Sequence, residues 1–237
     1  MRQNTAKSHL ESHGVLIPFD PTIITPAIKH AIDSGYFEAE EAEQLPHIVQ
    51  PDDIVLDIGA GIGFISTLIA RRAERVISVE ANPDLLPFME KLHAQNGVNN
   101  AKRLNVVLGD LETGFTTFYQ RNDFWMGSLS KGPNPYVATV KVPNMALNSL
   151  LESEGVSLIV CDIEGAEAFL FDLADLAGVD RVYLELHDHI TGLAGVASVF
   201  AALAAKGFTY DPRHSHGAIV LFRRVEKNET LRPYARL

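Results

Sequence analysis

The stretch IVLDIGAGIGFISTLIA, residues 54–70, decides the fold class. Its first part is a run of apolar and β-branched residues that ends in an acid, Asp57, as is typical of a buried strand. Three glycines then alternate at Gly59, Gly61 and Gly63, and a helix-like apolar segment follows. A glycine-rich turn between strand and helix lets a ligand approach the backbone at the carboxyl end of the strand. We therefore expect a ligand-binding turn in an open parallel sheet.

The rest of the chain continues this alternation of strands and helices. Apolar strands that alternate with helices predict an α/β fold with a mostly parallel sheet covered on both faces. The last two strands are joined by a short turn, which predicts an antiparallel last strand. The expected strands are residues 53–58, 75–80, 103–110, 156–163, 181–186, 207–212 and 217–224. The expected helices are residues 63–73, 82–97, 144–155, 164–176 and 195–207, after two within 25–49.

One segment departs from the alternation of strands and helices. Residues 113–142 read as two alternating, half-buried strands around a loop rich in Gly, Pro, Ser and Asn, and they predict an inserted β-hairpin after the third strand. Long loops in compact domains are usually functional or disordered, and this one contains Trp125. The expected organisation is an N-terminal arm and helices over 1–50, one domain over 51–225, and a tail over 226–237, with a loose arm over the first ~15 residues.

Composition narrows the class of protein. Twenty basic and thirty acidic side chains give a net charge of -10. A phosphate backbone favours clustered Lys and Arg, so we expect no nucleic-acid partner. The one cysteine, Cys161, allows no disulfide within the chain. The polar N-terminus lacks a signal-peptide core, and the apolar runs look strand-sized, so we expect no membrane span and a cytoplasmic protein.

Acidic side chains close the first three strands of the expected sheet. Asp57 suits a cationic or amino-bearing ligand better than a pyrophosphate. Glu80 ends the second strand, where a carboxylate can accept hydrogen bonds from both ribose hydroxyls, and Asp110 ends the third, near the rim of an adenine. Each acid alone would equally suit a helix cap or a solvated loop. Together they predict an adenosine ligand with an aminoacyl end, such as S-adenosylmethionine.

These segments resemble the class I S-adenosylmethionine-dependent methyltransferases, and more narrowly the FkbM family. The resemblance spans about residues 36–224 and lies in VLDIGAGIGFISTLIA, VISVEANPDLLPFMEKLHAQN, MGSLS and, above all, LIVCDIEGAEAFLF. It implies a Rossmann-like fold with a seven-stranded sheet. It also implies methyl transfer, usually to a hydroxyl, in a family whose known members methylate sugars and polyketide-type products.

The resemblance also implies the residues of the cofactor site. They belong to the glycine turn, the strand ends, the acidic segment FEAEE and the Ser-Leu pair of MGSLS. The expected cofactor-binding residues are Glu38, Asp57, Gly59, Ala60, Gly61, Gly63, Glu80, Ala81, Asn82, Gly109, Asp110, Ser128, Leu129 and Asp162. The cofactor would be S-adenosylmethionine and its product S-adenosylhomocysteine.

The candidate catalytic groups follow the fourth and fifth strands, which we expect to be neighbours. Asp162 and Glu164 follow the fourth strand, and His187 follows the fifth in YLELHDHI. A neutral imidazole can take a proton near pH 7, so His187 is expected to act as the base or to orient the acceptor. A structural histidine that bonds a carboxylate is the alternative. The same three residues leave room for a divalent cation, but none is predicted and no metal ligand is assigned.

The expected function is O-methylation of a hydroxyl on a small molecule or carbohydrate by in-line methyl transfer. One alternative is a non-catalytic module that binds S-adenosylmethionine. The other is a nicotinamide-dependent oxidoreductase, which would use G-x-G-x-x-G, whereas Phe64 stands in the last position of the spacing here. The edge of the inserted hairpin could pair two chains, so a homodimer stays open.

Overall fold

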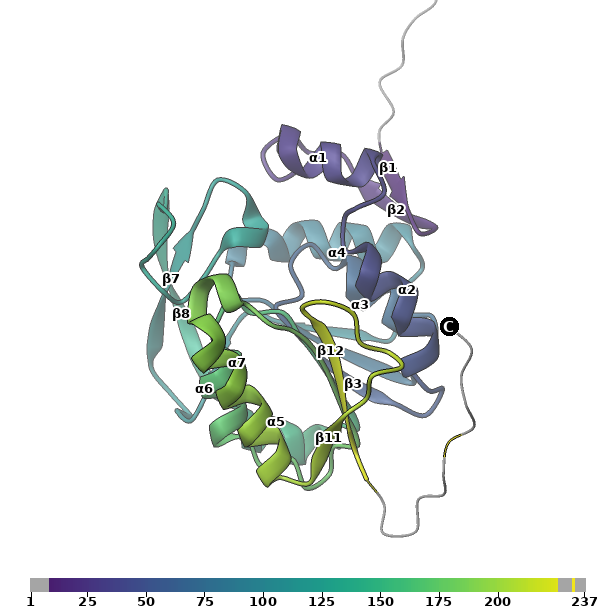
Figure 1. The fold of residues 1–237 in the computed structure, drawn as a ribbon. Helices are drawn as coiled ribbons and strands as arrows, with labels where there is room; N and C mark the ends of the chain where they lie inside the picture. Colours follow the sequence, from purple (N-terminus) through teal and green to yellow (C-terminus); the bar gives the residue numbers. More distant parts are fainter. Residues whose placement is uncertain (1–8, 226–231, 233–237) are drawn as a thin grey trace, which may run out of the picture.

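The structure is a computed structural model that describes residues 9–225 and 232. A seven-stranded sheet in the order β11-β12-β10-β9-β3-β4-β5 lies between two layers of helices (Figure 1). β12 runs antiparallel to both neighbours, and the other pairs from β10 to β5 are parallel. The predicted α/β fold with its antiparallel last strand is confirmed. The strands are β3 (Ile54–Ile58), β4 (Arg75–Val79), β5 (Ala101–Leu104), β9 (Leu158–Cys161), β10 (Arg181–Glu185), β11 (Phe208–Tyr210) and β12 (Ile219–Arg224).

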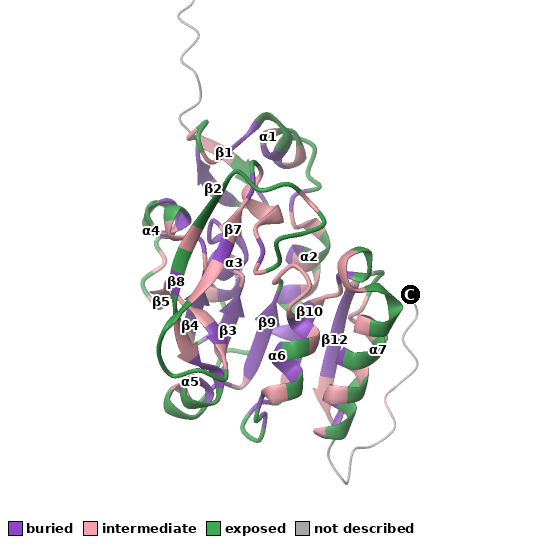
Figure 2. Ribbon diagram, turned by 90° about the vertical axis from the view of Figure 1, so that its left-hand side faces the viewer, coloured by how far each residue is buried: buried purple, intermediate pink, exposed green. Residues whose placement is uncertain are grey.

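Neighbouring residues on the central strands enter two separate cores. On β3, Val55 packs with α1 to α4, whereas Leu56 packs with α5 to α7. Because successive side chains of a strand point to opposite faces, a continuous apolar run is what a sheet covered on both faces requires. Figure 2 shows these strands as the most buried part of the molecule. The helices are α1 (Pro26–Asp33), α2 (Ala39–Ile48), α3 (Phe64–Ala70), α4 (Leu86–Gln95), α5 (Leu147–Glu154), α6 (Glu167–Leu173) and α7 (Asp188–Ala205).

The N-terminal segment is more ordered than the sequence predicts. The expected loose arm contains an antiparallel hairpin of β1 (His9–Ser12) and β2 (Val15–Pro18). Asn96, the residue that follows α4, holds this hairpin through both backbone groups of Leu16, accepting from its N–H at 2.9 Å and donating to its C=O at 2.8 Å. The polar sequence gives no local signal for a contact that spans 80 residues. Residues 1–8 and most of the predicted tail lie outside the described residues.

The third predicted strand is divided between two sheets. β5 ends at Leu104, and the chain then bends into β6 (Val107–Gly109), which belongs to a second sheet of order β6-β8-β7. Asn105 fixes the bend, because its side-chain amide donates to the backbone oxygens of Glu80 at 2.8 Å and Ala81 at 3.0 Å. Asp110 therefore does not end the third strand of the main sheet, as predicted, but follows β6.

The predicted inserted hairpin is present after the bend. β7 (Phe115–Gln120) and β8 (Ala138–Ala146) pair antiparallel, and β6 pairs parallel with the end of β8. Because β8 continues to Ala146, α5 begins at Leu147, three residues later than predicted. Figures 1 and 2 show this second sheet beside the main sheet, with an exposed loop between β7 and β8.

Helix α7 is longer and more apolar than predicted. By length and composition alone, it is the one helix among the described residues that could cross a membrane, with a mean hydropathy of 1.4 over 18 residues. The prediction that every apolar run is strand-sized was wrong here, because residues 190–205 carry no charge. In this fold α7 lies against α6 and β11, and it buries Val199 and Leu203 in the core.

The glycine turn after β3 is held between the neighbouring strands. The N–H groups of Gly59 and Ala60 donate to the backbone oxygen of Val79 on β4, at 2.9 and 3.0 Å. Gly59 has φ +87°, and a Cβ there would overlap the carbonyl oxygen of Asp162 after β9. Only glycine allows both the backbone conformation and this close approach.

Buried His93 on α4 supports the same turn from the side of α3. Its Nε2 lies 2.8 Å from Ser66 Oγ, which donates to the backbone oxygen of Gly63, and its Nδ1 lies 3.4 Å from Arg103 Nη1. A guanidinium can only donate, so Nδ1 accepts and Nε2 carries the proton of a neutral ring. Burial, and then the nearby Arg103 charge, lower the pKa of His93 to about 4.

Replacing Gly59 with Ala should abolish stable folding or cost more than about 4 kcal/mol, because two backbones would have to separate. Gly97→Ala is the matched control. Gly97 also has positive φ, +69°, but no atom lies within 4 Å of its Cβ position, so only the backbone cost of about 1–2 kcal/mol applies. Urea unfolding monitored by circular dichroism measures both changes. Equal stability of the two variants would contradict the close contact.

The contribution of His93 to stability should be lost in acid. Because its folded pKa lies below the unfolded value of 6.5, the contribution is complete above pH 6.5 and falls as the pH drops toward about 4. His93→Gln removes this titration. The difference in unfolding free energy between wild type and variant should therefore narrow from about pH 7 to pH 4.5 in urea titrations. A constant difference over that range would show that His93 is not held neutral.

Candidate active site

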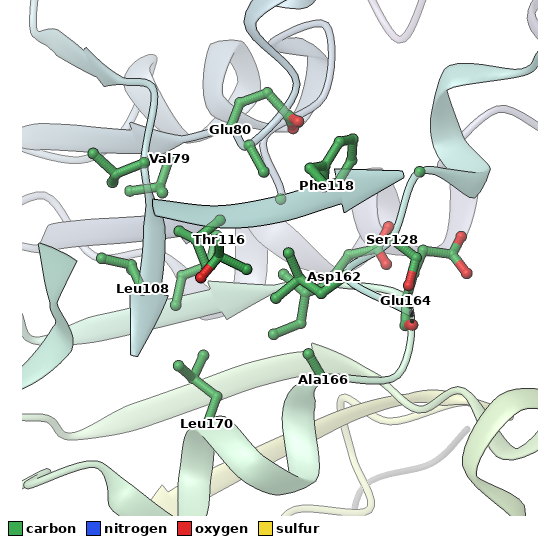
Figure 3. A pocket seen from close by; sticks show the side chains of 18 of the residues that line it. Val79, Glu80, Leu108, Thr116, Phe118, Ser128, Asp162, Glu164, Ala166 and Leu170 are labelled. Atoms are coloured by element: carbon green, nitrogen blue, oxygen red, sulfur yellow. Dashed lines mark hydrogen bonds between the residues drawn. The ribbon is translucent and has the colours of Figure 1, made fainter. Parts of the chain in front are cut away.

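A cavity of about 340 Å³ opens at the carboxyl ends of β3, β4 and β9, beside the second sheet (Figure 3). Its volume is within the range of pockets for cofactors and other small molecules, about 300–1,000 Å³. Most of the sequence-predicted site residues meet here, although they come from separate segments. Those that line the cavity are Glu38, Gly59, Gly61, Glu80, Ala81, Gly109, Asp110, Ser128, Leu129, Asp162 and Glu164.

Two predicted cofactor residues lie away from the cavity and have packing or capping roles. A Cβ on Gly63 would lie 2.6 Å from Met89 Cγ and 2.8 Å from His93 Nε2, so the contact between α3 and α4 needs a glycine there. Asn82 caps the short helix Pro83–Leu85, and its Oδ1 also accepts from Gln120 Nε2 at 2.8 Å. Asn82 thus joins the end of β4 to the inserted hairpin.

Glu80 is oriented by the glycine turn that it faces. Its Oε2 accepts from the Gly61 N–H at 2.8 Å, and its Oε1 accepts from the Asn82 N–H at 2.6 Å. Burial raises the pKa of Glu80 to about 7, against the effect of these backbone bonds. Each carboxylate oxygen has a second lone pair, so this fixed group can accept hydrogen bonds from a vicinal diol in the cavity.

Asp57 and Ala60 line a smaller cavity, of about 30 Å³, behind Gly59. The Oδ2 of Asp57 is buried and has no hydrogen-bond partner among the described residues. Burial, followed by the charges of Glu80 and Asp162, raises the pKa of Asp57 to about 8. A buried carboxylate oxygen without a donor is unfavourable, so a ligand with an ammonium group fits this position.

Two acids of the main cavity have strained backbones. Glu38 and Glu164 adopt the left-handed conformation, with φ of 47° and 53°, which is uncommon for residues other than glycine. Such strain clusters at functional sites, because the surrounding structure must impose it. Burial raises the pKa of Glu38 well above its usual range and that of Glu164 to about 7.

His187 joins the acids that follow β9. Its Nε2 lies 3.3 Å from Asp162 Oδ1 and 3.9 Å from Glu164 Oε2, and its Nδ1 lies 2.8 Å from Glu167 Oε1. Burial lowers the pKa of His187, but the interactions of its ring nitrogens with the accepting carboxylates of Asp162 and Glu167 outweigh burial and raise the pKa to about 11. A pKa in this range favours the protonated ring, whereas the sequence predicts a neutral base.

Aromatic side chains connect the N-terminal segment to the inserted loop above the cavity. Phe37 stacks on Trp125 with a ring separation of 6.2 Å, and both Trp125 and Phe124 line the cavity. Thr25 Oγ1 donates to Asp123 Oδ1 at 2.6 Å, across 98 residues. The tryptophan thus belongs both to a small apolar cluster and to the wall of the site.

Arg121 is a site residue that the sequence reasoning missed. It is buried, and its guanidinium donates to backbone oxygens within the loop, including Met126 at 2.9 Å and Ser130 at 3.0 Å. These bonds fold the loop around the cavity wall, where Ser128 lies between the two acceptors. An arginine next to a Gly- and Pro-rich loop was the available signal, because carbonyls of irregular loops need donors when they are buried.

Comparison with known proteins identifies the family of this arrangement. A family model described as "Methyltransferase FkbM domain" matches residues 57–219. In fold, the chain resembles the crystal structure of Trm5b from Pyrococcus abyssi, with a TM-score of 0.51 and 14% identity over 91% of this chain and 55% of that one.

Two curated relatives match shorter parts of the chain. A probable ribosomal RNA small subunit methyltransferase A of Methanosarcina mazei is 35% identical over 88 residues, 37% of this chain. An uncharacterised protein of Methanocaldococcus jannaschii is 26% identical over 115 residues, 48% of this chain. The matches span only 30% and 42% of the lengths of these relatives.

The expectation that nucleic acid is excluded as a partner was wrong. Several curated relatives, from Methanosarcina mazei and Methanosarcina acetivorans among others, are named as ribosomal RNA methyltransferases. Net charge describes the whole chain, whereas a substrate meets only one part of the surface. A charge of -10 is therefore not a ground for excluding a class of substrate.

Arg121→Met should loosen the inserted loop while leaving the two sheets folded. Met retains the length and apolar contacts of the side chain but donates no hydrogen bonds, so several loop carbonyls lose their partner. We expect faster protease cleavage within residues 122–137 and about tenfold weaker S-adenosylhomocysteine binding by calorimetry. Arg72→Met, on the exposed surface beyond α3, is the control. Unchanged cleavage and affinity in R121M would contradict the anchoring role.

Proposed function

The chain belongs to the FkbM methyltransferase family, and we propose that it transfers a methyl group from S-adenosylmethionine to a hydroxyl oxygen of a small molecule or carbohydrate. The observation that carries this proposal is the pairing of Glu80, held by two backbone N–H groups, with the partnerless carboxylate oxygen of Asp57. The first suits a ribose diol and the second an amino group. One adenosine ligand with an aminoacyl end satisfies both.

The remaining cavity wall suits the rest of that ligand. Asp110 and the apolar Leu108 and Phe118 line the side toward the second sheet, where an adenine would have a polar edge and two apolar faces. Because Gly59 and Gly61 have no side chain, the ligand can approach the backbone of the glycine turn closely. When bound, S-adenosylmethionine supplies a methyl group attached to a sulfonium sulfur. That sulfur is the leaving group, and it becomes the neutral thioether of S-adenosylhomocysteine.

The protein must align the acceptor and remove its proton. We assign proton removal to Glu164, whose carboxylate lines the cavity and has a side chain only 20% exposed. Asp162 Oδ1 is already engaged by His187, so Asp162 serves better to orient the acceptor. Alignment supplies much of the acceleration of such transfers, and a general base contributes about 10²–10⁴-fold.

A second acceptor class has its own support. The curated relatives named as ribosomal RNA methyltransferases match this chain at up to 37% identity over short segments. Their names describe what those proteins modify, and a nucleotide of RNA is accordingly the alternative acceptor. The two classes differ in the size of the substrate, so one assay separates them.

Calorimetric titration of the purified chain with S-adenosylhomocysteine tests the cofactor. Micromolar binding is expected for the wild type and for the control Glu43→Gln, an exposed acid on α2. Asp57→Ala and Glu80→Ala should each weaken binding about tenfold or more, because each removes a charge-assisted contact. NAD should not bind. Binding of NAD but not of the sulfur nucleotide would reject the proposal.

Transfer of a labelled methyl group tests the acceptor. The chain is incubated with labelled S-adenosylmethionine and either a panel of sugars and hydroxylated small molecules or ribosomal RNA. We expect label in a hydroxyl-bearing small molecule, and a loss of about 10²-fold or more in rate for Glu164→Gln. Label in RNA alone would replace the proposed acceptor with the alternative, and full activity of E164Q would remove the assigned base.

A further inference from the structure

Carboxyl groups gather around the small cavity behind Gly59. Its volume is about 30 Å³, enough for a water-sized occupant. No Lys or Arg stands among the described residues that line it. The five carboxyl side chains in its lining are Glu38, Glu41, Asp57, Asp162 and Glu185.

The cavity also holds buried polar atoms without partners. Tyr183 is 1% exposed and Asp57 is 3% exposed, and both line the cavity. Neither the Tyr183 hydroxyl nor Asp57 Oδ2 has a hydrogen-bond partner among the described residues. Buried polar atoms are normally satisfied by protein, water or an ion. The proposed ammonium group accounts for Asp57 Oδ2, so the Tyr183 hydroxyl is the atom that indicates a further occupant with polar contacts.

Three side chains at the edge of this cavity converge on a point. One ligand atom each from Asp162, Glu185 and His187 lie within 4.8 Å of one another. In octahedral coordination with bonds near 2.1 Å, neighbouring ligands are about 3.0 Å apart and opposite ones about 4.2 Å. We propose that Asp162, Glu185 and His187 bind a divalent cation, with a metal-bound water filling the cavity toward Tyr183.

His187 is oriented for such a role. Its side chain is 3% exposed, and Glu167 Oε1 faces its Nδ1 at 2.8 Å, which leaves Nε2 directed toward Asp162. Glu167 is itself held, because it accepts from the N–H groups of Ile163 and Gly165. A carboxylate behind the other ring nitrogen is the usual way in which proteins orient a metal-binding histidine. The ion displaces the Nε2 proton as it binds.

The ligand set defines the chemical class of the ion. Two carboxylates and one imidazole suit a hard or borderline cation such as Mn²⁺ or Mg²⁺, with further positions left to water or substrate oxygen. Asp162 is half exposed toward the main cavity, so one open position faces the proposed acceptor. In this respect the inference rests on the proposed function, because the ion would hold acceptor oxygens, but binding of the ion itself requires no turnover.

Mn²⁺ binding to the full chain tests the site directly. Titration followed by electron paramagnetic resonance, with and without saturating S-adenosylhomocysteine, should give one Mn²⁺ per chain, with a dissociation constant below about 1 mM. Glu185→Gln, which preserves shape and removes one ligand charge, should weaken Mn²⁺ binding about tenfold or more. Glu43→Gln on α2 is the matched control and should bind Mn²⁺ like the wild type.

Asp162→Asn is the second variant, and circular dichroism of every variant verifies folding. Three results would overturn the site. They are absence of Mn²⁺ binding, a wild-type affinity for Mn²⁺ in both E185Q and D162N, and loss of Mn²⁺ when S-adenosylhomocysteine binds. The last outcome would assign the carboxylates to the amino group of the cofactor. A chain that binds S-adenosylhomocysteine but no Mn²⁺ would retain the proposed function without the ion, and the reverse result would retain the ion alone.

Discussion

The close approach of Gly59 to the backbone of Asp162 is the contact on which the site depends. It brings the ends of β3 and β9 together, so the glycine turn and the loop that carries Asp162 and Glu164 form adjacent walls of the cavity. A side chain at this position would separate the two walls. The same contact divides the interior into a large cavity on one side and a small acidic one on the other, and Gly59 lines both.

Much of the fold could be predicted from local patterns, because alternating apolar segments and turns are recorded in neighbouring residues. The alternation of strands and helices, the antiparallel β12 and the inserted hairpin all follow from such patterns. What could not be predicted depends on distant partners. The N-terminal hairpin needs Asn96, and the bend between β5 and β6 needs the backbone of residues 80–81. Neither partner is visible in the segment that it shapes.

The candidate site likewise has features that the local sequence indicates and features that depend on distant residues. Acids at strand ends are recognisable, since parallel strands end at one edge of the sheet, and Asp57, Glu80 and Asp162 could be predicted on that ground. Charge states and orientations are not recorded in sequence. The pKa of His187 depends on carboxylates that close around it only in the folded chain. Arg121 donates to buried backbone oxygens of the loop, and the Tyr183 hydroxyl faces an internal cavity. The spacing of residues in the sequence reveals neither of these environments.

The second sheet has a consequence for how this protein can change over evolutionary time. It has its own hydrogen-bonded pairs, and the chain enters it at residues 105–106 and leaves it at residues 146–147. Insertions, deletions or recombination within this block alter the cavity wall formed by β6, β7 and the loop between β7 and β8. They leave the glycine turn and the acids Asp57 and Glu80 of the main sheet intact, so lineages can vary one wall of the chamber while they inherit the opposite one unchanged.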